Sequence, residues 1–158
     1  MVDLITPLVI LALVLLVMIR HISAGIAIIA LLAGVMLDQL VASSLIDALP
    51  KQETAIQLYV QVVVHLLITF APMAVVLTVV KANKKTIVIS LLSSLLLGFL
   101  VVYFALGVLE PIPILTTEIR KSGLFSFVRP YQITIIAVAA ILALVALVID
   151  HKNPSTKK

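Results

Sequence analysis

The chain contains no cysteine, and only 11% of its 158 residues are charged. The missing cysteines exclude disulfide bonds, thiolate metal ligands and cysteine nucleophiles. A typical soluble domain has about 25% charged and about 45–50% apolar residues, whereas 63% of this chain is hydrophobic. Because the apolar residues form long runs, lipid is the expected solvent for much of the surface. The sequence therefore predicts a single membrane domain whose first partner is the lipid bilayer.

Signals for catalysis and nucleic-acid binding are also missing. The sequence has no glycine-rich phosphate loop, no metal-ligand cluster and no nucleophile–base constellation. Its three histidines, His21, His65 and His151, fall in three different parts of the chain. The net charge of +4 is small and spread over loops, which argues against nucleic-acid binding. We therefore predict a protein that is not an enzyme and that needs no metal and no cofactor.

Five apolar runs are each long enough, or nearly so, to cross a bilayer as a helix. The predicted fold is all-α, a multi-pass transmembrane bundle within residues 1–149, with helices near residues 4–19, 24–41, 55–80, 86–109 and 131–149. Residues 114–128 mix apolar and charged side chains, which predicts a segment on the membrane surface. Residues 150–158 are expected to form a polar tail. The first run is predicted to stay uncleaved, because its basic residue, Arg20, follows the apolar stretch; a signal peptide cut near Ser23 is the alternative.

The distribution of basic residues predicts the orientation of this five-helix bundle. Seven basic residues fall on one side of the membrane and four on the other. Because basic loops stay in the cytoplasm, the side with seven is expected to be cytoplasmic. The N-terminus is then outside, the C-terminus is cytoplasmic, and the protein belongs to a plasma membrane. The seven are Arg20, Lys81, Lys84, Lys85, Lys152, Lys157 and Lys158, and the four are Lys51, Arg120, Lys121 and Arg129.

The third run carries a polar ladder, because Gln57, Gln61, His65 and Thr69 recur every fourth residue along one helix face. Polar side chains facing lipid are costly, so the ladder is expected to face other helices or water. If Ser44 is taken as the outer end of the second helix, Asp38 lies roughly 9 Å below it. Gln61 lies roughly 9 Å and His65 roughly 15 Å below the outer end of the third helix. The sequence therefore predicts Asp38 beside Gln61, with His65 one turn deeper.

Two interpretations of this candidate polar site remain open. Its hydrogen bonds can fix the register of neighbouring helices, each contributing about 0.6–2 kcal/mol. Alternatively, Asp38 and His65 can carry protons, because histidine titrates near neutral pH and a carboxylate favours its charged form. The first interpretation is favoured because ionisable groups are so few in these runs.

Small residues spaced by four predict close helix packing. Ala30 and Gly34 form one such face in the second run, and Ser90, Ser94 and Gly98 form another in the fourth. The alanines of the fifth run provide a third smooth stripe. These faces predict either packing inside the bundle or association with another subunit or a second copy.

Residues 1–109 resemble the colicin V production protein family of bacterial inner-membrane proteins. The resemblance rests on Asp3, the basic turn Arg20–His21, Gly25, Gly34, the loop Lys81–Lys85 and Gly98. It implies a location in the bacterial inner membrane and a link to envelope processes or toxin export, and it implies no catalytic residues.

Together these patterns predict a non-enzymatic accessory or scaffold subunit of an envelope or export-related membrane assembly. The alternative is a small channel or transporter component with a polar path at Asp38, Gln61 and His65.

Overall fold

The computed structural model describes residues 2–19, 23–49, 54–79 and 87–152. These residues are helical apart from short connections, and they contain no strand, which confirms the predicted all-α class. The loops at Arg20–His21 and Lys81–Lys85 lie outside the described residues, as do residues 153–158. The elements are α1 (Val2–Ile19), α2 (Ala24–Ala48), α3 (Thr54–Val79), α4 (Ile87–Leu109), α5 (Pro113–Lys121), α6 (Gly123–Val128), the 3₁₀ turn η1 (Arg129–Tyr131) and α7 (Gln132–Lys152).

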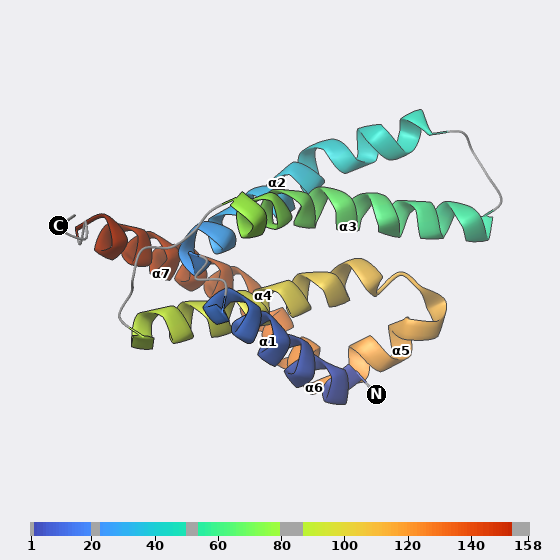
Figure 1. The fold of residues 1–158 in the computed structure, drawn as a ribbon. Coiled ribbons are helices and arrows are strands. Elements are labelled where there is room, and N and C mark those ends of the chain that lie inside the picture. The colour runs from blue at the N-terminus through green and yellow to red at the C-terminus, as the bar shows by residue number, and fades with distance from the viewer. Residues whose placement is uncertain (1, 20–22, 50–53, 80–86, 153–158) are drawn as a thin grey trace.

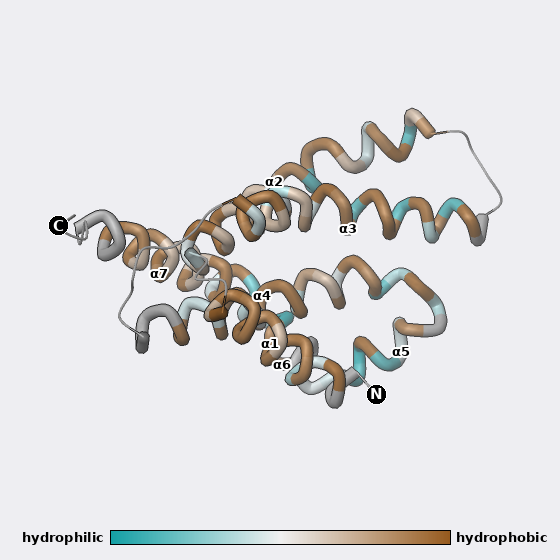
Figure 2. The backbone as a smooth tube through the Cα atoms, in the orientation of Figure 1, coloured by the Kyte–Doolittle hydropathy of each residue, from teal (hydrophilic) through white to brown (hydrophobic). Residues whose placement is uncertain are grey.

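Four stretches of the described chain are long and apolar enough to cross a membrane: Ala24–Ala48, Ile56–Val79, Leu91–Leu109 and Ser126–Val148. They give the protein the composition of an integral membrane protein, and Figure 2 shows hydrophobic colour along most of their length. The apolar stretch of α1, Ile5–Ile19, is shorter. The 18 residues of α1 extend roughly 27 Å, close to a hydrocarbon core of about 30 Å. A fifth crossing by α1 therefore remains a prediction.

The second helix is longer than its sequence pattern indicates. It was predicted to end near Val41, with a polar stretch after it, but α2 continues to Ala48. The serines and Asp47 of this stretch are compatible with a helix, and no glycine or proline interrupts it. The helix ends at Leu49, whose backbone is extended at φ −79° and ψ 146°. Because Pro50 follows, Leu49 is disfavoured from the helical region, which places the helix end at this point.

The helices pack mainly as three pairs: α2 with α3, α1 with α4, and α2 with α7. Figure 1 shows α2 and α3 side by side as a hairpin, with α1 lying along α4. The start of α1 and α5 lie at one end of the array, and the end of α7 lies at the other (Figure 1). The core of the described residues includes the fully buried side chains of Ala27, Ile28, Leu31, Leu97 and Leu100.

Glycines mark the closest approaches between helices. A Cβ atom on Gly34 would overlap the backbone carbonyl oxygen of Thr69, so α2 and α3 approach closely there. A Cβ on Gly98 would lie 3.1 Å from Ile10 Cγ2, in the α1–α4 contact, and one on Gly25 would lie 3.0 Å from the Ala143 carbonyl oxygen of α7.

The predicted small-residue faces are thus used inside the chain. Gly34 and Gly98 meet neighbouring helices, and Ser94 is completely buried. Ala30 is half-buried on α2, and the side chain of Ser90 lies outside the described residues. The sequence left open whether these faces pack inside the bundle or bind another subunit or copy. The contacts of Gly34 and Gly98 are examples of packing inside the bundle.

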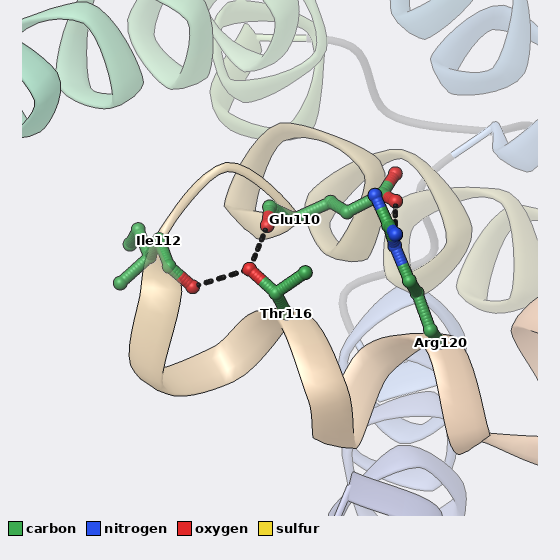
Figure 3. Close-up of polar contacts among 4 residues, drawn as sticks. All are labelled: Glu110, Ile112, Thr116 and Arg120. Carbon is green, nitrogen blue, oxygen red and sulfur yellow. Dashed lines mark hydrogen bonds and ion pairs between the residues drawn. The ribbon is translucent and has the colours of Figure 1, made fainter.

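A polar clasp joins the end of α4 to α5 (Figure 3). The hydroxyl of Thr116 donates to the carbonyl oxygen of Glu110 at 2.7 Å and also lies 2.9 Å from that of Ile112. Arg120 Nε donates to Glu110 Oε1 at 2.8 Å. The clasp holds α5 back against the end of α4, and the helix then breaks at Ser122, between α5 and α6.

We expect the hydroxyl of Thr116 to contribute more to this clasp than the exposed ion pair. Thr116→Val should lower the local stability of α5 by about 1 kcal/mol, because it leaves a part-buried carbonyl oxygen without its donor. Arg120→Gln should cost only a few tenths of a kcal/mol, because the Arg120 side chain is 62% exposed and water screens the pair. Amide hydrogen exchange of α5 measures both, and a larger loss of protection in Arg120→Gln would contradict this assignment.

Candidate functional site

The third and second helices are joined by one charged contact. Nδ1 of His65 on α3 lies 2.8 Å from Oδ1 and 3.0 Å from Oδ2 of Asp38 on α2. The Asp38 side chain is 17% exposed and that of His65 is 37% exposed, so the pair is partly buried yet reachable by water. Ionisable side chains within membrane helices are rare and usually face a partner or a water-filled cavity.

The length of α2 explains why Asp38 meets His65. Asp38 lies ten residues before Ala48 (48 − 38), and His65 lies eleven residues after Thr54 (65 − 54). At 1.5 Å per residue both are roughly 15–17 Å from the helix ends that the hairpin connects. The sequence prediction paired Asp38 with Gln61 because it ended α2 too early, and the true partner is one helical turn deeper.

A cavity of about 400 Å³ opens beside this pair, between α2, α3, α4 and the start of α7. It is within the size range of small-molecule pockets, about 300–1,000 Å³. The lining residues are Val35, Asp38, His65, Thr69, Tyr103, Phe104, Gly107, Val108, Glu110, Pro111, Arg129 and Gln132. The cavity runs from the end of the bundle near α5 to the middle of α3. The residues at that end are Glu110 and Pro111, which follow α4, and Arg129 and Gln132, which begin η1 and α7.

The cavity wall combines charges of both signs with neutral hydrogen-bonding groups. Asp38 and Glu110 supply carboxylates, and Arg129 supplies a guanidinium. Tyr103 and Gln132 add a hydroxyl and an amide. Glu110 is also held by Arg120, so one carboxylate is paired with an imidazole and the other with a guanidinium. Among the described residues, no three His, Cys, Asp or Glu side chains are grouped so that they could hold a metal ion.

The polar ladder divides into two halves. His65 and Thr69 line the cavity, and Thr69 is only 2% exposed, whereas Gln57 and Gln61 are absent from the cavity wall. Each four-residue step turns about 40° around a helix, so Gln57 points about 80° away from His65. The ladder therefore leaves the cavity towards the outer end of α3.

Four polar residues of the cavity wall were missed by the sequence prediction: Tyr103, Glu110, Arg129 and Gln132. The one signal in the sequence that could have identified two of them is that Glu110 and Arg129 are charged residues at the two ends of the long segment between the fourth and fifth predicted helices. Nothing in their spacing connects them to Asp38, because the helix packing alone brings them to one cavity.

Small residues pack tightly between α2 and α7. Ala24 and Ala27 are completely buried, and Gly25 packs against Ala143 and Ala146 of α7. These small residues bring α2 and α7 into close contact beyond the deep end of the cavity.

Comparisons with protein families, curated proteins and solved structures found no match. The resemblance to the colicin V production family therefore stays a prediction from the residue pattern.

Proposed function

We propose that this protein is a small transporter component of the plasma membrane, in which Asp38 and His65 form a proton-binding pair. The observation that carries the proposal is that this hydrogen-bonded pair lines a cavity with polar walls between the helices. A polar pair that served only as helix glue would be enclosed by neighbouring side chains. Here 37% of the His65 side chain is exposed.

The geometry defines how the pair handles a proton. An ionised carboxylate only accepts hydrogen bonds, so Nδ1 of His65 carries a hydrogen and donates it to Asp38. The lone pair on Nε2 is then the position that takes up a second proton from water in the cavity. Loss of the same proton restores the neutral ring.

Other polar and charged groups line the cavity around His65. Asp38 faces His65 from α2, Tyr103 and Glu110 lie on α4, and Arg129 lies on η1. The cavity residue from α7, Gln132, does not titrate. Of these side-chain types only imidazole ordinarily changes charge between about pH 5 and 8. His65 is therefore the group to which we assign the proton.

The proposed topology has five crossings, with α1 as the first and the cavity opening outside the cell. It rests on the excess of basic residues on the side of the C-terminus. The start of α1 and the end of α7 lie at opposite ends of the array in Figure 1, which is compatible with an odd number of crossings. A bacterial inner membrane is the location that the residue pattern of the first two thirds of the chain favours.

Proton uptake into proteoliposomes tests the proposal. The vesicles contain a pH-sensitive dye, and a potassium diffusion potential drives protons inwards. The wild-type protein should then acidify the vesicle lumen. His65→Ala and Asp38→Asn should each lower the rate of proton uptake at least tenfold. A positioned proton acceptor in an enzyme typically contributes a factor of about 10²–10⁴ to the rate, which we take as the upper range here.

The matched control is Gln61→Leu, because Gln61 belongs to the same ladder but is outside the cavity wall. It should retain most of the wild-type rate. Equal rates for the wild type and His65→Ala would overturn the proposal, as would an equally large loss in Gln61→Leu.

The accessory-subunit alternative drew its support from the small-residue faces. Because Gly34, Ser94 and Gly98 pack within the chain, these positions offer less surface to another subunit. A partner protein retained through purification in mild detergent, together with no proton uptake by either the isolated chain or the complex, would favour this alternative.

A further inference from the structure

A second, apolar cavity of about 220 Å³ lies between α1, α4 and α5. It is separate from the polar cavity, since the two share no lining residue. Its wall is almost entirely hydrocarbon, with Thr6 as the single polar residue. The lining residues are Ile5, Thr6, Val9, Val101, Val102, Ala105, Leu106, Leu109, Leu115 and Ile119.

We propose that this groove binds one anionic phospholipid, with an acyl chain between α1 and α4 and the phosphate at the basic end of α5. This proposal is independent of proton transport. The groove runs along α4, a helix of membrane-spanning composition, where the surrounding solvent is lipid. From Leu109 to Val101 it follows α4 for roughly 12 Å towards the middle of the membrane, as an acyl chain would.

The fifth helix supplies the polar end of the site. Leu115 and Ile119 of α5 contribute to the groove, and the last turn of the same helix carries Arg120 and Lys121. Both basic side chains are exposed. Arg120 uses Nε for Glu110, but a guanidinium has five N–H donors and can bind a phosphate at the same time. Apolar residues towards the groove and basic residues at its end match an anionic lipid in both charge and shape.

Native mass spectrometry of the full chain in detergent, titrated with lipid after delipidation, tests the site. The probes are phosphatidylglycerol and phosphatidylcholine with identical acyl chains. We expect one tightly bound phosphatidylglycerol and at least fivefold weaker binding of phosphatidylcholine, because a basic residue at the membrane surface contributes about that factor. Equal binding of the two lipids would overturn the anionic assignment, and no saturable binding of either would overturn the site.

Two pairs of variants locate the lipid. Ala105→Phe fills the groove and should weaken lipid binding more than tenfold, whereas Leu95→Phe, on the exposed surface of the same helix, should leave it unchanged. Lys121→Gln should reduce the preference for phosphatidylglycerol about fivefold, and Lys121→Arg should preserve it. Because Lys121 is exposed, its variants test the site even where Ala105→Phe fails to fold. Unchanged binding in Ala105→Phe, or unchanged preference in Lys121→Gln, would contradict the proposal.

Discussion

Gly34→Ala is expected to destabilise the protein by at least about 3 kcal/mol, the upper end of the usual cost of overpacking. The added methyl group would overlap the carbonyl oxygen of Thr69. A flexible side chain could turn away, but this obstacle is backbone of α3. The two helices would therefore have to separate over the part of the hairpin that holds Asp38 against His65. Chemical or thermal unfolding in detergent micelles measures the effect, and the amount of folded protein recovered replaces it where the variant fails to fold.

The same substitution at the other glycines provides a graded control. Gly107→Ala should be neutral or stabilise by up to about 1 kcal/mol, because alanine favours a helix and a Cβ there meets nothing within 4 Å. Gly25→Ala and Gly98→Ala should fall between the two, because their nearest atoms lie at 3.0 and 3.1 Å. Equal stabilities for Gly34→Ala and Gly107→Ala would contradict the close approach of α2 and α3.

Proline in α3 adds to the physical reason for this close approach. Pro72 has no N–H, so the carbonyl oxygen of Ile68 lacks its usual intrahelical donor. A Cβ on Gly34 would lie only 3.2 Å from that oxygen. With no side chain on Gly34, its Cα–H hydrogens can face the carbonyl groups of α3, a contact that recurs between closely packed helices.

Gly107→Trp is expected to reduce proton uptake at least tenfold while the protein stays folded. Gly107 lines the polar cavity and is exposed, and a Cβ there meets open space. An indole at this position would extend into the space through which water reaches His65. The proton acceptor would be intact but cut off from bulk water, so the loss would appear in uptake and not in unfolding.

Because the native chain has no tryptophan, the fluorescence of this variant comes from the introduced indole. The introduced indole would be the single one in the chain, so its emission and its quenching by iodide report whether it is enclosed. Leu95→Trp is the matched control, because Leu95 lies on the same helix and is 52% exposed outside the cavity. Full proton uptake in Gly107→Trp with an enclosed indole would exclude this cavity as the path.

The candidate site was partly predictable. Asp38, His65 and Thr69 could be selected because polar side chains in long apolar runs are few and costly. The partner of Asp38 was predicted wrongly, because the mixed residues Ser43–Ala48 give no clear helix or loop signal. An error of a few residues in a helix end shifts the estimated depth by a full turn, which is enough to exchange Gln61 for His65.

The sequence by itself determined the class of the protein, because long apolar runs with so few charges can only be placed in lipid as helices. It also determined which residues permit close helix contacts, since only small side chains do so. The tertiary structure decided where those contacts are made and which polar groups share one cavity. Glu110 and Arg129 join Asp38 and His65 there, and no periodicity within a helix encodes this. The positions of helices relative to one another depend on packing between segments that are far apart in the chain.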